Sequence, residues 1–213
     1  FDATGFLSKD VNELSLSVRD VSDTSYHSRG KQKLKRGGIW YTPQSGIWQT
    51  VWAECIPKDC VRSLHITSDF DHACVNLVSD CVGESKAYAL FDGQQYPLPA
   101  SIPVPGFEPW SPENPKLYDF SVICGADRVE SYFAMRKFSV EADENGVKRL
   151  FLNGKPYFHN GLLDQGYWSD GMYTAPSDEA LIFDIQTAKD MGFNMLRKHI
   201  KIEPLRWYYH CDR

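Results

Sequence analysis

The sequence of 213 residues predicts a mainly β fold that ends in a short α/β region. Three observations support this prediction. Apolar and polar residues alternate in several short runs up to about residue 140, and clusters of turn residues separate these runs. A helical spacing of apolar residues is confined to the C-terminal part of the chain. The composition, with 42% hydrophobic and 24% charged residues, is that of an ordinary globular protein.

The first region, residues 1–56, is predicted to form β-structure with long loops. Apolar residues at alternate positions predict a half-buried strand, and they are Leu14, Leu16 and Val18. A polar segment with a basic cluster follows at 20–38 and is typical of a solvated loop. A second apolar run, which begins at Ile47 and ends at Pro57, has the character of a strand.

The middle region, residues 57–140, is predicted to form an immunoglobulin-like β-sandwich. Short strands separated by Gly, Pro, Asp and Ser clusters, without a helical period, are typical of antiparallel sandwiches. The candidate strands are 61–67, 73–78, 86–91, 117–123 and 129–135. The Cys–Trp–Cys arrangement of antibody domains is missing.

The last region, residues 141–213, changes its pattern. Asn153-Gly154 predicts a tight hairpin between 149–152 and 155–158. A strand near 161–163, a helix at 178–191 capped by Ser177, a strand at 193–197 and a helix from Pro204 then form a βαβα series. A complete (β/α)8 barrel needs roughly 250 residues. The sequence therefore predicts the incomplete start of such a barrel, in a chain cut from a longer protein.

Composition also excludes several functions. The formal net charge of −5 argues against a nucleic-acid partner, and no apolar stretch is long enough to span a membrane. The six cysteines form no CxxC pair and no zinc spacing, so no metal site is expected. They are interpreted as reduced thiols, with a Cys74–Cys81 disulfide left open. This usage slightly favours a cytoplasmic over a periplasmic location.

Three motifs, in one order, resemble glycoside hydrolase family 2. IWYTPQSGIWQTVW at 39–52 is similar to the last strand of the family's sugar-binding jelly roll, and PWSPENPKLY at 109–118 is similar to a motif of its immunoglobulin-like middle domain. The opening of the family's TIM barrel is similar to LNGKP at 152–156 and GFNMLR at 192–197, and then to Trp207-Tyr208 and to CDR at 211–213. The resemblance implies part of a jelly roll, a sandwich and a barrel start.

The resemblance implies a parent enzyme that is a retaining β-glycosidase, of the β-galactosidase, β-glucuronidase or β-mannosidase class. Such enzymes use two carboxyl groups about 5–5.5 Å apart, as nucleophile and as acid/base. In the family both are Glu residues on later barrel strands, which are expected beyond Arg213, so the chain alone is expected to be inactive. The alternative from the residues is a non-catalytic carbohydrate-binding or adhesive β-sandwich module. An oligomeric parent is left open.

Five residues are candidates for contact with a carbohydrate substrate: Arg197, Asp164, His199, Asp23 and Trp168. Arg197 matches the family's Asn-x-x-Arg position, where the guanidinium contacts the substrate side and the nucleophile; a structural ion pair is its alternative role. Trp168 lies in a Gly-rich loop after the first barrel strand, where loops line an active site. Asp164 and His199 stand where the β-galactosidase subgroup has other patterns, which puts galactose specificity in doubt.

The alternative for His199 is a buried structural histidine. Asp23 resembles a sugar- and sodium-binding Asp of β-galactosidases, and its alternative is an Asx-type turn. No cofactor is expected for the chain, and a sodium or magnesium ion in the parent is left open.

Overall fold

The computed structural model describes residues 1–213, which divide into two compact units. Unit 1 comprises Phe1–Thr50, Gln165–Pro176 and Lys198–Ile202. Unit 2 comprises Val51–Asp164, Ser177–Arg197 and Glu203–Arg213. Each unit is therefore assembled from segments that are far apart in the sequence. No helix of either unit has the length and apolar character needed to span a membrane.

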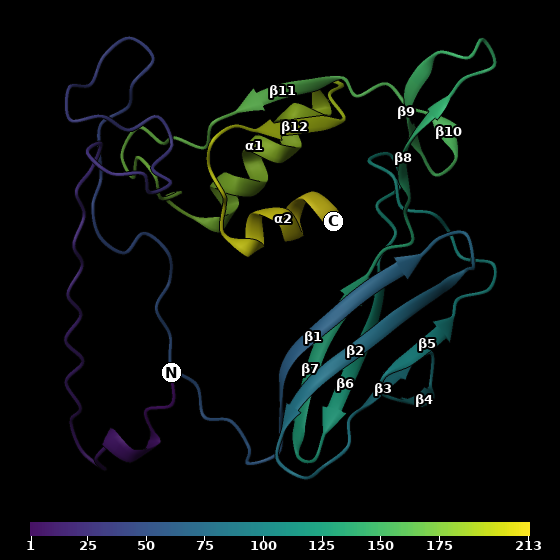
Figure 1. The fold of residues 1–213 in the computed structure, drawn as a ribbon, viewed down its shortest axis with the longest axis horizontal. Helices are drawn as coiled ribbons and strands as arrows, with labels where there is room; N and C mark the ends of the chain where they lie inside the picture. The colour runs from purple at the N-terminus through teal and green to yellow at the C-terminus, as the bar shows by residue number, and fades with distance from the viewer. The chain divides into compact units, whose positions relative to one another are not determined.

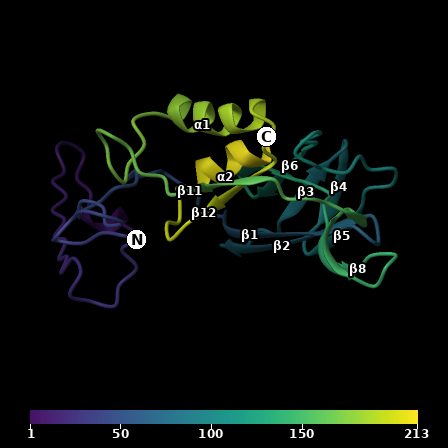
Figure 2. The same ribbon diagram turned by 90° about the horizontal axis from the view of Figure 1, so that it is seen from above.

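The largest part of unit 2 is an antiparallel β-sandwich (Figure 1). One sheet has the order β1 (Cys60–Asp69), β2 (Cys74–Val82) and β5 (Ala100–Pro103). The other has the order β4 (Gln94–Pro97), β3 (Tyr88–Phe91), β6 (Tyr118–Cys124) and β7 (Asp127–Phe133). Figure 2 shows β1 and β2 in one layer and β3, β4 and β6 in the other. The mainly β prediction is confirmed.

The sandwich encloses one hydrophobic core, to which both sheets contribute alternate residues. Val75 and Leu77 point inward from β2, and Phe120 and Val122 point inward from β6. Because successive side chains of a strand face opposite sides, this alternation is the sequence pattern that predicted the strands. Burying each such side chain is worth about 1.5–3 kcal/mol, so the core dominates the stability of this region.

Two strands of the sandwich, β4 and β5, were not expected from the sequence. Pro97, Pro99 and Pro103 interrupt the apolar pattern in this stretch. Proline lacks the N–H that a central strand needs, but an edge strand tolerates it. Both strands lie at the edge of their sheets, which reconciles the prolines with strand structure.

A small three-stranded sheet follows the sandwich in unit 2. It consists of β8 (Phe138–Ala142), β9 (Lys148–Leu152) and β10 (Lys155–Pro156), in the order β10-β9-β8. Asn153 and Gly154 join β9 to β10 with φ angles of 53° and 75°. Two successive positive φ values are what an Asn-Gly hairpin turn requires, so the predicted hairpin is confirmed.

The C-terminal α/β part follows the predicted order of elements. β11 (Gly161–Asp164) is followed by α1 (Asp178–Asp190), β12 (Met195–Lys198) and α2 (Leu205–Asp212), and β11 pairs with β12. The two strand arrows point the same way in Figure 1. The hydroxyl of Ser177 accepts a hydrogen bond from the Ala180 N–H at 3.2 Å, which confirms it as the N-cap of α1.

The N-terminal part of unit 1 has almost no regular structure. It contains a short 3-10 helix at Thr4–Phe6 and a few isolated bridges, such as that between Gln32 and Tyr41. The predicted strand through Leu14, Leu16 and Val18 is wrong, because this run pairs with no other strand and all three side chains are exposed. Alternation alone does not make a strand stable when no neighbouring strand accepts its hydrogen bonds.

Candidate functional site

The ends of β11 and β12 present two of the candidate residues in unit 2. Asp164 is the last residue of β11, and Arg197 precedes the last residue of the neighbouring strand β12. Asp164 is half-buried and Arg197 is exposed. An exposed guanidinium at a strand end has its planar donor fork available for a carboxylate or a sugar hydroxyl.

In unit 1, the loop that follows β11 packs on the N-terminal segment through two tyrosines. The rings of Tyr41 and Tyr167 are stacked, with centroids 3.9 Å apart and planes 9° apart. The Tyr41 hydroxyl donates to the Gln165 side-chain oxygen at 2.8 Å, and the Tyr167 hydroxyl donates to the Thr42 carbonyl at 2.8 Å. Burial, and then the neighbouring Tyr173 and Tyr41, raise the pKa of Tyr167 to about 12, so this hydroxyl keeps its proton and remains a donor.

The buried amine of Lys201 holds this loop from the inside of unit 1. Its Nζ donates to the carbonyl oxygens of Gly166 and Tyr173, at 2.5 and 2.7 Å. The same nitrogen lies 4.5 Å from the centroid of the Tyr173 ring and 5.4 Å from that of Trp48, which are cation–π distances. Burying a charge is costly unless it is solvated by the protein, and here two carbonyls and two ring faces do so.

Neither Lys201 nor Tyr173 was a candidate on the sequence. Lys201 follows Arg197 and Lys198 in a basic stretch that looks solvent-exposed. Nothing in a single sequence distinguishes a buried lysine from an exposed one.

Trp168 lies in the same loop and has an unusual environment. Its backbone N–H donates to the Met172 carbonyl at 2.7 Å, which closes the loop on itself. Its side chain is half-buried, and the indole Nε1 is buried without a hydrogen-bond acceptor in the chain. A buried donor without a partner costs about 1–3 kcal/mol, so this group needs a specific explanation, such as an ordered water or a role in chemistry.

His199 lies in the other short segment of unit 1, next to a strained residue. The imidazole is half-buried, and Ile200 has a φ of 63°. Positive φ is rare for a β-branched side chain and costs on the order of 1–3 kcal/mol. Strain of this kind persists where the surrounding structure fixes the backbone, and it is enriched at functional sites.

Asp23 occupies a turn, as its alternative interpretation anticipated. The Asp20 carboxylate accepts from the Ser22 N–H at 2.7 Å, an Asx-type contact, and Ser22 has a φ of 50°. The Asp23 carboxylate accepts from the Leu34 N–H at 3.3 Å and thereby closes the basic loop. Within unit 1, Asp23 therefore has a structural partner, in contrast to the indole N–H of Trp168.

The WSPE motif, at 110–113, forms a structural junction inside unit 2. The buried Trp110 donates from its indole to the Asp212 carbonyl at 2.6 Å, and its own carbonyl accepts from the Asn153 side chain at 2.9 Å. The Asp212 carboxylate binds Arg136 at 2.8 Å and the Tyr132 hydroxyl at 3.1 Å. The motif thus ties the sandwich to the hairpin turn and to the end of α2.

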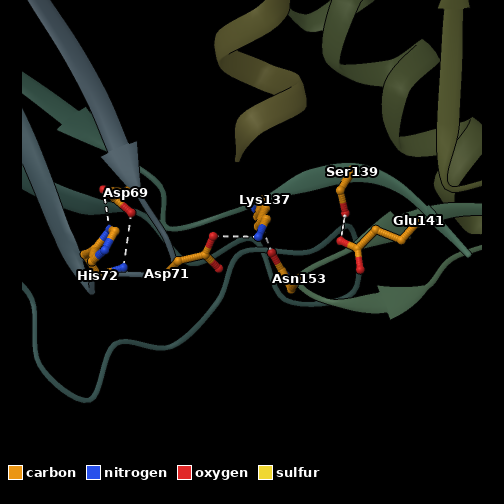
Figure 3. Close-up of polar contacts among 7 residues, drawn as sticks. All are labelled: Asp69, Asp71, His72, Lys137, Ser139, Glu141 and Asn153. Atoms are coloured by element: carbon orange, nitrogen blue, oxygen red, sulfur yellow. Dashed lines mark hydrogen bonds and ion pairs between the residues drawn. The ribbon is translucent and has the colours of Figure 1, made fainter.

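A second polar cluster of unit 2 lies between the turn after β1 and the small sheet (Figure 3). Asp71 pairs with Lys137 at 2.6 Å, and the backbone of Lys137 donates to the Asn153 side chain at 3.0 Å. The Asp69 carboxylate is hydrogen-bonded to the imidazole Nδ1 of His72, at 2.8 Å. The Asp71 and His72 side chains are exposed, and exposed ion pairs are worth at most about 1 kcal/mol, so these contacts add little to the stability of unit 2.

Comparison with known proteins adds a likeness in sequence over the whole chain. No family model matches it. It is 24% identical over 233 residues to a β-galactosidase of Streptococcus thermophilus and 28% identical over 249 residues to one of Psychromonas ingrahamii. Both alignments cover 100% of this chain, which spans only 22% and 23% of those proteins.

The fold is similar to parts of solved glycosidases. A β-glucuronidase of Faecalibacterium prausnitzii superposes with a TM-score of 0.65 at 20% identity, over 74% of this chain and 27% of that chain. A β-glycosidase of Bacteroides vulgatus gives a TM-score of 0.63 at 22% identity, over 82% and 25%. A family 2 β-galacturonidase of Eisenbergiella tayi, bound to galacturonate, gives 0.64 at 18% identity, over 74% and 31%.

The fold and the sequence likeness relate this mainly β chain to bacterial glycosidases. The resemblance is, more particularly, to glycoside hydrolase family 2, and that expectation from the three motifs is confirmed.

Proposed function

We propose that the chain is an internal part of a retaining β-glycosidase of family 2, with a β-galactosidase-like or β-glucuronidase-like parent. The observation that carries the proposal is the alignment with β-galactosidases over the whole chain. The nucleophile and acid/base carboxylates of the reaction are then supplied by Glu residues beyond Arg213. The chain itself contributes binding and architecture.

The proposal includes a division into three domains. Residues 1–56 would belong to a sugar-binding jelly roll, 57–140 to an immunoglobulin-like sandwich and 141–213 to the start of a TIM barrel. The strand orders β1-β2-β5 and β4-β3-β6-β7 support the second assignment, because seven antiparallel strands in two sheets are typical of that class. The order β11, α1, β12, α2 supports the third.

In the parent, Arg197 would bind the nucleophile carboxylate and keep it ionised, and Asp164 would accept a sugar hydroxyl. The exposure of Arg197 near the end of β12 supports its role. The unpaired indole N–H of Trp168 supports a contact between this loop and the carbohydrate. His199 would donate to a hydroxyl, while Asp23 is the weakest of the five assignments because its carboxylate already closes a loop.

The test uses Arg197→Ala and Arg197→Lys in the full-length parent. If the guanidinium acts on the nucleophile, the Ala variant is expected to lose roughly 10²–10³ in kcat/KM while its melting temperature stays nearly unchanged. Lys retains the charge but not the paired donors, and so it is expected to restore activity only in part.

The opposite result has a clear signature. An Arg197→Ala enzyme that melts several degrees lower, yet keeps its kcat/KM per folded molecule, would make Arg197 a scaffold residue. The proposed lack of the two carboxylates is tested separately: the purified 213-residue chain is expected to release no nitrophenol from nitrophenyl β-glycosides above a mock preparation. Turnover by the chain would contradict it.

A further inference from the structure

Three cysteines lie at the same end of the sandwich, on strands that belong to different sheets. Cys60 is the first residue of β1, Cys81 precedes the last residue of β2, and Cys124 is the last residue of β6. β1 and β2 belong to one sheet and β6 to the other. All are free thiols in the structure.

Several contacts hold these strand ends together. Cys60 stands opposite Val82 in the β1–β2 ladder. The carboxylate of Asp59, which precedes β1, accepts from the Ser85 N–H just after β2, at 3.2 Å. A side chain at Gly125, just after β6, would come within 2.8 Å of the Asp59 Cβ. The ends of β2 and β6 therefore meet around Asp59.

Cys81 and Cys124 both face the core from opposite sheets. Cys81 continues the inward-facing alternation of Val75 and Leu77, and it packs against the core. Cys124 continues the alternation of Phe120 and Val122 and is fully buried. Its Sγ contacts the Ser85 carbonyl at 3.5 Å.

The environment of Cys124 includes the Cys81 thiol. Burial, and then the nearby Cys81, raise the pKa of the Cys124 thiol to about 11. Cys124 is therefore protonated at neutral pH and unreactive towards large reagents. Cys81 is only partly buried, so it is the sulfur of this pair that a reagent from solution can reach.

We propose that Cys81 and Cys124 form a reversible disulfide that joins the two sheets of the sandwich when the chain meets a low-molecular-weight disulfide. They lie on the second and sixth strands, which are the strands that the inter-sheet disulfide joins in antibody domains. The site is one of covalent modification, independent of the proposed glycosidase function.

The exchange balances with glutathione disulfide as the oxidant. The Cys81 thiolate attacks one sulfur of the reagent, forms a mixed disulfide and releases one glutathione. Cys124 gives its proton to the glutathione thiolate released first, attacks the Cys81 sulfur and releases the second glutathione as its thiolate. Two protein thiols are thus oxidised and one glutathione disulfide is reduced. An open hollow of about 290 Å³ beside this end of the sandwich, lined in part by Asp59, Glu84 and Gly125, gives the reagent room to approach.

The experiment incubates the 213-residue chain in buffers of increasing glutathione disulfide to glutathione ratio. Free thiols are blocked, and the peptides are mapped by mass spectrometry without reduction. We expect a peptide pair linked through Cys81 and Cys124, which dithiothreitol separates. Closing the long loop between them is expected to raise the melting temperature by about 10 °C.

Variants identify the pair. Cys81→Ser and Cys124→Ala are expected to abolish both the linked peptide and the rise in melting temperature, whereas Cys55→Ser, at an exposed thiol, is expected to change neither. A Cys60–Cys81 link, a glutathione adduct that persists on Cys81, or six alkylated thiols at every ratio would overturn the proposal. Because the mapping is done on the unaltered chain, it does not depend on whether a variant folds.

Discussion

The contacts that stabilise unit 1 internally differ in kind from those that stabilise unit 2. Every buried hydrophobic side chain lies in unit 2, whereas the buried residues of unit 1 are Gln32 and Lys201. The large apolar residues of the first fifty positions, such as Leu14 and Val18, are exposed. Since apolar burial is the main driving force of folding and a hydrogen bond adds only about 1 kcal/mol net, unit 2 is expected to be stable and unit 1 marginal.

The largest effect expected from this difference is in amide hydrogen exchange. Backbone amides of β2 and β6 should exchange only on global unfolding, while those of residues 1–50 should exchange by local opening, at least about 10³-fold faster. Peptide-resolved exchange followed by mass spectrometry measures both in one sample. Equal protection of the two units would show that unit 1 has a stability that its contacts do not explain.

A core substitution should be the most damaging single change. Leu77→Ala removes a fully buried side chain of the sandwich and should lower the free energy of unfolding of unit 2 by about 2–5 kcal/mol. The matched control, Leu14→Ala, changes the same residue type in unit 1 and should cost less than about 0.5 kcal/mol. Urea unfolding measures both, and similar losses for the two variants would be inconsistent with the comparison.

The polar packing of unit 1 can be weakened without touching unit 2. Lys201→Met keeps the length of the side chain but leaves the carbonyls of Gly166 and Tyr173 without their donor. A loss of about 1–3 kcal/mol in local protection is expected in Gln165–Pro176, with the melting temperature of unit 2 unchanged. Lys35→Met, at an exposed lysine, is the control. Unchanged exchange in that loop would mean that Lys201 does not hold it.

The smallest effect is expected at alkaline pH in unit 2. Burial, and then Asp212, raise the pKa of Tyr132 to about 12, compared with about 10 in an unfolded chain. The folded state thus holds this proton more tightly, and the resulting stability is present below pH ~10 and is lost as the pH rises from ~10 to ~12.

Tyr132→Phe should therefore reduce the decline in unfolding free energy between about pH 9 and about pH 11. Tyr26→Phe, at a fully exposed ring, should leave the decline unchanged. Part of the decline should persist in both variants, because Tyr157 also has a pKa raised to about 12, by burial and its bond to Glu113. Parallel pH profiles for the chain and Tyr132→Phe would contradict the assignment.

The sequence predicted the features that local patterns encode. Alternation in 73–78 and 117–123 correctly predicted strands, because alternate side chains of β2 and β6 face the core of the sandwich. The same alternation at Leu14–Val18 misled, since a strand also needs a partner that the pattern does not specify. The Asn153-Gly154 turn and the Ser177 cap were predictable because each depends on its own residues and near neighbours.

The candidate site was less predictable, because it depends on contacts between distant segments. Trp168 was a candidate on its loop position, but only the structure reveals its unpaired indole N–H. Lys201 is buried by Tyr173 and Trp48, which lie far from it in sequence, so nothing local identified it. For Asp23, the nearby Asp20 and Ser22 did indicate a turn, and the turn is what forms.

The hydrogen bond from Trp110 to Asp212 can form only late in the synthesis of the chain. The acceptor carbonyl is translated 102 residues after the indole that donates to it. A ribosome adds about 5–20 residues each second, so Trp110 is synthesised roughly 5–20 s before its acceptor. Until Asp212 is synthesised, Trp110, Tyr132 and Arg136 lack their hydrogen-bond partner on the nascent chain. The end of α2 completes these contacts. A ribosome stalled before Cys211 would therefore carry a sandwich that lacks its bonds to Asp212.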